Sequence, residues 1–186
     1  MEEGIARMKL HLGCGKRNFG SDWIHIDGGN FAHLDYYDIT DLSQFDDETV
    51  NLIYASHVFE YFDREEIVHI LHEWKRVLKP DGILRLAVPN FKVFCELYTK
   101  NVYGCDRFLG SLYGKMYMGD KTIYHKTVYD DVALSKVLID AGFKYTRLWD
   151  WRTTDHSHID DCSQAYLPHM DKENGVHMSL NMEAIK

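Results

Sequence analysis

The stretch LHLGCG, residues 10–15, followed by the carboxylate of Asp27, carries the strongest indication of fold in this chain. A short apolar strand runs into Gly13 and Gly15, and a second apolar run, residues 23–26, ends at Asp27. Glycine lets backbone N–H groups approach a bulky ligand, because no side chain intervenes. A carboxylate at the end of the neighbouring strand accepts hydrogen bonds from a ribose diol. Together these features predict a site for a nucleoside-containing cofactor.

Length and charge limit the classes of protein to which the chain can belong. Its 186 residues are most simply one domain with a substantial core. The net charge of −8, from 21 basic and 29 acidic residues, argues against a duplex nucleic-acid binder, whose surface should be basic. No apolar run is long enough to span a bilayer, and the acidic start lacks a signal-peptide pattern. With four scattered cysteines, we expect a reduced, cytoplasmic protein without membrane contact.

Apolar runs alternate with turn signals over residues 8–90, which is typical of a parallel sheet. A helix is expected after Asp63, an N-cap with Glu66 as its capping-box partner. Strand, helix and strand in that order imply a right-handed parallel crossover. The expected strands in this half are residues 8–12, 23–26, 50–55 and 83–88, with a weaker one at 34–39.

The second half predicts helices near residues 92–100 and over 130–141, the latter closed by Gly142, and a strand over 143–149. Apolar and polar residues alternate over 176–184, the period of an antiparallel strand with one solvent-exposed face. The fold class is therefore α/β, a Rossmann-like and mainly parallel sheet with a late antiparallel strand.

In this order the segments resemble the class I S-adenosylmethionine-dependent methyltransferases, and within them a small bacterial, type 11-like subgroup. The resemblance implies a trimmed form of that fold, S-adenosylmethionine as cofactor, and methyl transfer to a small-molecule or sugar-like acceptor. It also implies one domain over residues 1–186, with a cofactor-binding half at 8–90 and acceptor-side segments at 91–128 and 150–172. The matching segments are HLGCG at 11–15, ID at 26–27, YDI at 37–39, NLIYASHVFEY at 51–61 and RVLKPDGIL at 76–84.

The resemblance also implies roles for individual residues. Gly13 and Gly15 would lie under the methionine part of the cofactor, and Asp27 would hold its ribose. Ser56 and His57 would lie beside the sulfonium and the acceptor. The full implied cofactor-binding set is Leu12, Gly13, Cys14, Gly15, Asp27, Gly28, Asp38, Ile39, Ser56 and His57, with Asp38 and the Ile39 backbone at the adenine.

Some positions depart from the family pattern. His11 stands where the family usually has an acid, and Arg17 where it often has a third glycine. The link from Gly15 to Trp23 is too short for a helical crossover, so we expect the first helix to be missing or cut to one turn. Asn18 occupies the last glycine position of the NAD and FAD fingerprint, which disfavours those cofactors.

Two histidines are candidate catalytic bases, because methyl transfer leaves an acceptor proton to remove. His57 ends the fourth expected strand, and His125 precedes the helix at 130–141. Each has an ordinary structural alternative, His57 as a residue packed under the sheet edge and His125 as a loop residue. The candidate acceptor-binding residues are Tyr124, Tyr129, Trp151 and Arg152.

Two other functions remain open. The altered glycine motif is compatible with a protein that binds the cofactor or a nucleotide without catalysing transfer. His156 and His158, near Asp160 and Asp161, raise the alternative of a metal-dependent hydrolase. Their spacing matches no structural zinc pattern, so no metal is expected.

Overall fold

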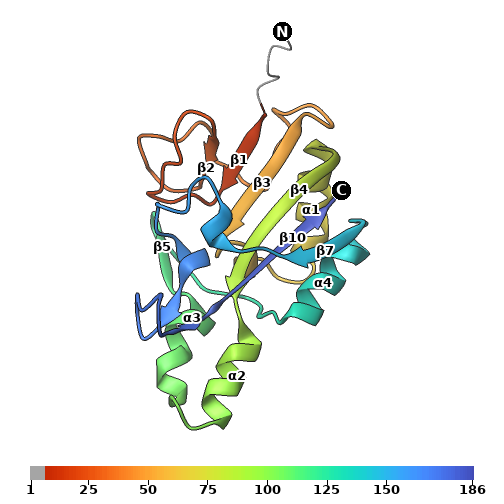
Figure 1. The fold of residues 1–186 in the computed structure, drawn as a ribbon. Helices are drawn as coiled ribbons and strands as arrows, with labels where there is room; N and C mark the ends of the chain where they lie inside the picture. The colour runs from red at the N-terminus through yellow and green to blue at the C-terminus, as the bar shows by residue number, and fades with distance from the viewer. Residues whose placement is uncertain (1–6) are drawn as a thin grey trace.

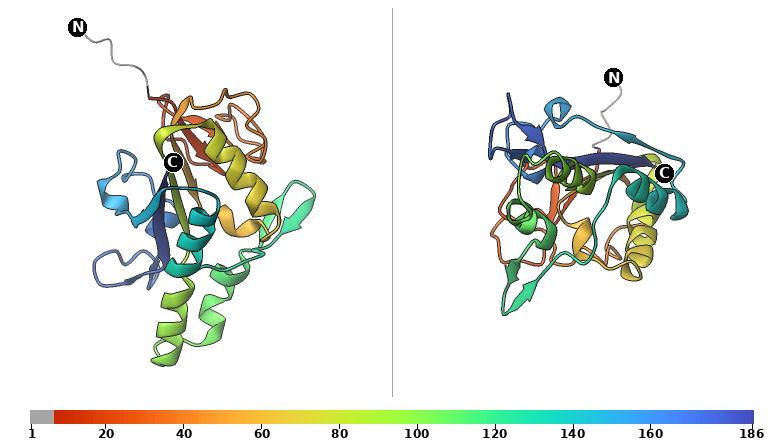
Figure 2. Two further views of the ribbon diagram at one scale, coloured as in Figure 1. Left: turned by 90° about the vertical axis from the view of Figure 1, so that its right-hand side faces the viewer. Right: turned by 90° about the horizontal axis from the view of Figure 1, so that it is seen from below.

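The computed structural model describes residues 7–186, which form one six-stranded sheet with helices packed on one of its faces (Figures 1 and 2). The first four strands along the chain run parallel, and β10 is antiparallel to both of its neighbours, which confirms the predicted fold class. Across the sheet the strands are β2 (Ile24–Ile26), β1 (Lys9–Leu12), β3 (Val50–Ser56), β4 (Leu78–Pro89), β10 (Ser179–Ile185) and β7 (Tyr145–Leu148).

The remaining elements are short or lie outside this sheet. None of the helices within residues 7–186 has the length and apolar character needed to cross a membrane. The helices are η1 (Phe59–Tyr61), α1 (Glu66–Val77), α2 (Phe91–Thr99), η2 (Cys105–Phe108), α3 (Leu109–Tyr113), α4 (Asp131–Asp140), η3 (Trp151–Thr153) and η4 (Cys162–Gln164). The short strands are β5 (Met116–Met118), β6 (Lys121–Ile123), β8 (Tyr166–Leu167) and β9 (Val176–His177).

The two long helices of the core begin at the caps that the sequence predicts. The Asp63 carboxylate accepts from the N–H groups of Glu65 and Glu66 at 3.0 and 2.9 Å, and Glu66 Oε2 accepts from the Asp63 N–H at 3.1 Å. Asp130 accepts from the Ala133 N–H at 2.7 Å at the start of α4. These bonds satisfy N–H groups that have no partner inside a helix.

No helix links β1 to β2, as the short spacing predicts. The expected strand at residues 34–39 is wrong, because only an Ile26–Tyr36 bridge joins this segment to the sheet. The Asp38 side chain accepts from the N–H and the hydroxyl of Thr40, at 2.8 and 2.7 Å. Such a turn withdraws the backbone from strand pairing, and the chain leaves the sheet there.

The two faces of the sheet differ in chemistry. One face is apolar and packs against α1 and α4, with Leu10, Ile53, Leu84 and Ala184 among its fully buried residues. The opposite face carries a row of paired residues that crosses all six strands. In order across the sheet this row is His25, His11, Tyr54, Arg85, Glu183 and Arg147.

This polar face is buried, which corrects the prediction that β10 has one solvent-exposed side. Glu183 is 3% exposed, and its carboxylate accepts from Arg85 at 2.9 Å and from Arg147 at 2.7 Å. The Asn181 amide donates to the Ser163 carbonyl at 3.0 Å. The chain between β7 and β8 lies over this face (Figure 2). The two guanidinium groups supply the hydrogen bonds that water would otherwise give this carboxylate.

An aromatic layer covers the same face where the first helix of the family would pack. The Phe19 ring stacks between His11 and His156, with ring centroids 3.9 and 4.0 Å away. Trp23 and Tyr54 contact this stack edge-on. The Tyr54 hydroxyl donates to Asp161, which ties the covering segment to β3. These aromatic side chains therefore cover a part of the sheet that a helix would otherwise cover.

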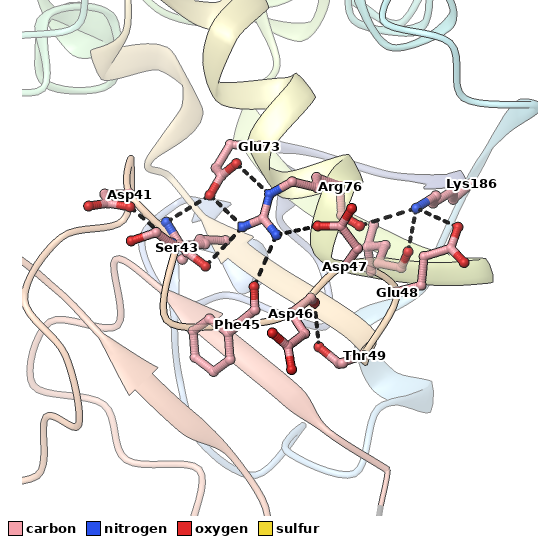
Figure 3. A network of polar contacts seen from close by, with 12 residues as sticks. Asp41, Ser43, Phe45, Asp46, Asp47, Glu48, Thr49, Glu73, Arg76 and Lys186 are labelled. Atoms are coloured by element: carbon pink, nitrogen blue, oxygen red, sulfur yellow. Dashed lines mark hydrogen bonds and ion pairs between the residues drawn. The ribbon is translucent and has the colours of Figure 1, made fainter.

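Arg76 holds the segment after the predicted adenine contact against α1 (Figure 3). Its guanidinium donates to Glu73 at 2.7 Å and to Asp47 at 2.6 Å. It also donates to the carbonyls of Leu42 and Phe45, each at 3.0 Å. One cation thus fixes a loop that has no regular secondary structure of its own.

Candidate functional site

The carboxyl ends of β1, β3 and β4 point toward the insert that carries α2 and α3 (Figure 1). In open α/β sheets ligands bind outside the carboxyl ends of the strands. The predicted cofactor-binding residues Leu12 and Ser56 are the last residues of β1 and β3. The structure therefore brings the glycine turn and the Ser56–His57 pair to the same edge.

The two glycines of the turn have different surroundings. Gly13 has φ +65° and donates its N–H to the Ile26 carbonyl at 2.7 Å, and a Cβ there would overlap Val58. Gly15 has φ +56°, and a Cβ there would meet only the Arg17 guanidinium, at 4.0 Å. Gly13 is required for packing, whereas the space above Gly15 is open and can receive a ligand.

The Asp27 carboxylate ties β2 to the glycine turn. Its Oδ2 accepts from the Gly15 N–H at 2.8 Å, and its Oδ1 accepts from the Gly29 N–H at 2.7 Å. Each oxygen keeps a second lone pair, so the carboxylate can still accept from hydroxyl groups. A Cβ on Gly28 would lie 2.6 Å from Met118 Cε, so the β5–β6 hairpin reaches the same edge.

The other predicted cofactor-binding residues are either buried or engaged in hydrogen bonds within the protein. Cys14 is buried, which raises the pKa of its thiol to about 12 and leaves it unreactive. The exposed Asp38 uses its carboxylate in the Thr40 turn. The Ile39 carbonyl accepts from Trp74 Nε1 at 2.7 Å. The segment at Asp38 and Ile39 is therefore well fixed, but Asp38 has a structural role of its own.

His57 adopts an unusual backbone conformation at the end of β3. It has φ +54° although it is not glycine, and its N–H donates to the Ala87 carbonyl at 2.8 Å. The neighbouring Ser56 hydroxyl is buried and has no hydrogen-bond partner within residues 7–186. Strained residues and unpaired buried polar groups concentrate at functional sites, which supports the prediction at this pair.

Glu60 is a buried carboxyl group that sequence reasoning missed. Its side chain is 1% exposed, and its Oε1 lies 3.6 Å from His57 Nδ1 and 3.5 Å from His125 Nε2. Burial raises the pKa of Glu60 to about 8. The only signal in the sequence is its place one turn after His57, inside an otherwise apolar run.

His125 lies between the Ser111 carbonyl and the Glu60 carboxyl. Its Nδ1 lies 3.0 Å from the Ser111 carbonyl, which only accepts, so Nδ1 carries the hydrogen. Burial lowers the pKa of His125 and raises the pKa of Glu60, so a neutral imidazole faces a neutral carboxyl. The His125 side chain is only 5% exposed, so it is badly placed to contact an acceptor directly.

His57 is the better placed of the two candidate bases. Its side chain is 16% exposed, and its Nε2 lies 3.3 Å from the Ser179 hydroxyl. Burial lowers the pKa of His57 to about 3, and the charge of Arg17 lowers it further. His57 is therefore neutral at physiological pH and is a weak base.

His11, which replaces the family's acidic residue, does not face the site. It is 1% exposed and stacked on Phe19, and burial lowers its pKa well below the usual value. A neutral, stacked ring cannot supply the negative charge that the family's carboxylate supplies.

The predicted acceptor-binding residues fall into different environments. Trp151 and Arg152 line an open depression together with Trp149 and His177. Tyr124 is 46% exposed, whereas Tyr129 is 4% exposed and packs on Phe59 in the core. The burial of Tyr129 leaves it little surface for an acceptor.

The two histidines of the metal hypothesis are also separated by environment. His156 is buried in the Phe19 stack, and neither of its ring nitrogens has a hydrogen-bond partner in the described chain. His158 is exposed. Across residues 7–186, no three His, Cys, Asp or Glu side chains are grouped as a metal site would need.

A family model matches part of the chain, beginning directly after Asp27. A family model described as "Methyltransferase domain" matches residues 28–86. No curated protein sequence matches the chain.

Solved structures share the fold at low sequence identity. A S-adenosylmethionine-dependent methyltransferase from Methanosarcina mazei is 17% identical, with 96% of this chain and 92% of that chain covered and a TM-score of 0.58. One from Archaeoglobus fulgidus is 14% identical, with 97% and 86% covered and a TM-score of 0.55. Burkholderia thailandensis 1,6-didemethyltoxoflavin-N1-methyltransferase, solved with bound 1,6-didemethyltoxoflavin and S-adenosylhomocysteine, is 12% identical, with 97% of this chain and 72% of that chain covered and a TM-score of 0.54.

Proposed function

We propose that this chain, a member of the class I S-adenosylmethionine-dependent methyltransferase family, is an enzyme that methylates a small-molecule acceptor. The observation that carries the proposal is the open space above Gly15 beside the Asp27 carboxylate. It lies at the carboxyl end of a parallel sheet, next to the strained His57. The residues present fit an adenosyl cofactor at that edge.

Each part of the edge suits one part of the cofactor. The turn at Gly13 and Gly15 would lie under the methionine part, and Asp27 would accept from the ribose hydroxyls with its free lone pairs. The segment at Ile39, fixed by Trp74, would border the adenine. His57 would lie nearest the acceptor.

When bound, S-adenosylmethionine supplies a methyl group that is already activated on a sulfonium. The chain's own residues then need only to orient the acceptor and exclude water. His57 is neutral, so one of its ring nitrogens keeps a lone pair that can accept a proton. Its Nε2 lies 3.3 Å from the Ser179 hydroxyl, which itself donates to Asn181 Oδ1 at 2.8 Å. Glu60 lies 3.6 Å from the His57 Nδ1 on the other side of the ring.

The depression beside Trp151 is our candidate acceptor site. Arg152 and Lys172 lie over the Trp151 ring, 4.6 and 4.9 Å from its centroid. The Arg152 guanidinium is held by the Tyr166 hydroxyl at 2.9 Å and faces Asp150 at 3.4 Å. His177 also lines the depression, and its Nε2 lies 2.8 Å from the Ser163 carbonyl. An aromatic face with a cation suits a planar or sugar-like acceptor with a negative group.

A transfer assay tests the proposal. The wild-type chain would be incubated with S-adenosylmethionine labelled on the methyl group and a panel of planar, sugar-like and carboxylate acceptors. We expect labelled product with at least one acceptor, and a loss of product in Asp27→Ala. Lys16→Ala, an exposed neighbour of the turn, serves as the matched control and should keep the activity.

The weak basicity of His57 favours a second candidate function, a protein that binds the cofactor without transferring its methyl group. Stoichiometric binding of S-adenosylhomocysteine without product from any acceptor would support this alternative. Product formation would exclude it.

A further inference from the structure

Arg17 places a cation over the glycine turn. Its backbone N–H donates to the Cys14 carbonyl at 3.1 Å, so the chain folds back on itself directly after Gly15. Within residues 7–186, and leaving aside Gly15 and its two chain neighbours, its Nη1 is the one atom that comes within 4 Å of the position that a Cβ on Gly15 would take, at 4.0 Å. The guanidinium therefore borders the open space that the proposed cofactor would enter.

The Arg17 side chain is held in place but its charge is left uncompensated. Its Nε donates to the Asp160 carbonyl at 3.0 Å, which fixes the direction of the guanidinium. Within residues 7–186 no carboxylate oxygen lies within 4.0 Å of it, whereas Arg76 and Arg85 each form ion pairs. An arginine that is anchored through one nitrogen and has its terminal nitrogens free is prepared to bind an anion.

Because Arg17 belongs to the glycine turn, its charge lies where the amino-acid end of the proposed cofactor would lie. The positive charge of Arg17 contributes to lowering the pKa of His57, at the end of β3, and opposes the rise in the pKa of Cys162 that burial causes. A side chain from the glycine turn reaches only the part of a ligand that lies on that turn. In a chain with a net charge of −8, an anionic group needs such a local cation.

We propose that the Arg17 guanidinium binds the carboxylate of the cofactor's methionine part. This assignment rests on the proposed function. The Arg17 contact would take the place of the one that an acidic residue at the position of His11 would make. His11 is buried and stacked on Phe19, so the amino-acid end of the cofactor has no carboxylate partner from β1. The amino-acid end of the cofactor would then be recognised through its carboxylate group by Arg17, and not through its ammonium group by an acidic residue.

Calorimetric titration with two ligands tests this assignment. S-adenosylhomocysteine carries the amino-acid carboxylate, and 5′-methylthioadenosine is an adenosyl thioether that lacks it. In Arg17→Gln we expect the affinity for S-adenosylhomocysteine to fall at least about tenfold, which corresponds to about 1.4 kcal/mol. The affinity for 5′-methylthioadenosine should stay unchanged, and Lys16→Ala, which removes a neighbouring exposed charge, should change neither.

The other outcomes separate the two proposals. Equal weakening of both ligands in Arg17→Gln would mean that Arg17 only supports the loop at Asp160, and an unchanged affinity for S-adenosylhomocysteine would mean that it makes no contact. Tighter binding of S-adenosylmethionine by the variant would mean that Arg17 only repels the sulfonium. Each of these overturns the assignment while the proposed function stands. A wild-type chain that binds neither ligand overturns both proposals.

Discussion

Acidification should destabilise this protein through His156. The ring is 3% exposed and stacked on Phe19, and neither of its nitrogens has a hydrogen-bond partner within residues 7–186. Burial lowers the pKa of His156 from 6.5 to about 4, against the opposing charges of Asp161 and Asp155. The neutral ring therefore fits the aromatic layer, and the protonated ring does not.

The magnitude follows from the difference in proton uptake between the two states. Because the folded-state pKa is depressed, the unfolded chain binds more protons between pH 6.5 and about 4, and stability falls as the pH falls through that window. Between pH 7 and pH 5 the loss from this one group is about 2 kcal/mol. Other buried groups titrate in the same range, so the contribution of His156 must be isolated by comparison with a variant.

Urea unfolding followed by tryptophan fluorescence at pH 7 and pH 5 makes that comparison. His156→Leu, which keeps a similar volume, should lose about 2 kcal/mol less than the wild type between the two pH values. His158→Leu is the matched control, because His158 is exposed, and it should behave as the wild type. The reasoning is refuted if the unfolding free energies of His156→Leu and the wild type depend on pH in the same way. It is also refuted if His158→Leu reduces that pH dependence as much as His156→Leu does.

Three further predictions concern the site itself. Gly13→Ala should cost roughly 1–3 kcal/mol of unfolding free energy in urea titrations, and Val58→Ala in the same chain should recover only the part due to overlap, because the positive φ remains. Asp27→Ala should weaken S-adenosylhomocysteine binding by about 1–3 kcal/mol in calorimetry, and an unchanged affinity would leave Asp27 as a turn residue only. Glu60→Gln should gain stability relative to the wild type as the pH rises from 5 toward 8, since the raised folded-state pKa of about 8 makes the Glu60 contribution to stability fall in that window. An identical pH profile of unfolding in Glu60→Gln and the wild type would show that Glu60 is ionised in the fold.

The sequence predicted correctly those elements that depend only on residues close together in the chain. The capping box of Asp63 and Glu66 predicted the start of α1, and the short link after Gly15 predicted a missing helix. The parallel pairing of β3 with β4 followed from the apolar runs and one crossover rule. The weak strand at residues 34–39 failed because the side chain of Asp38 competes for the backbone.

What the sequence could not show depends on contacts between distant segments. The alternation in β10 correctly indicated an antiparallel strand, but Glu183 and Asn181 are buried by an irregular segment that has no periodicity to detect. Glu60 shares its environment with His125, which lies far along the chain. The open side of Gly15 and the free charge of Arg17 likewise arise only when the turn is folded. The site's chemistry is therefore set by tertiary contacts more than by its motif.

The most direct test of the central claim is calorimetric titration of the purified wild-type chain with S-adenosylhomocysteine. The account predicts one bound ligand per chain at the edge formed by Gly15 and Asp27, with clear weakening in Asp27→Ala. No binding to a folded wild-type chain, or binding that Asp27→Ala leaves unchanged, would contradict it.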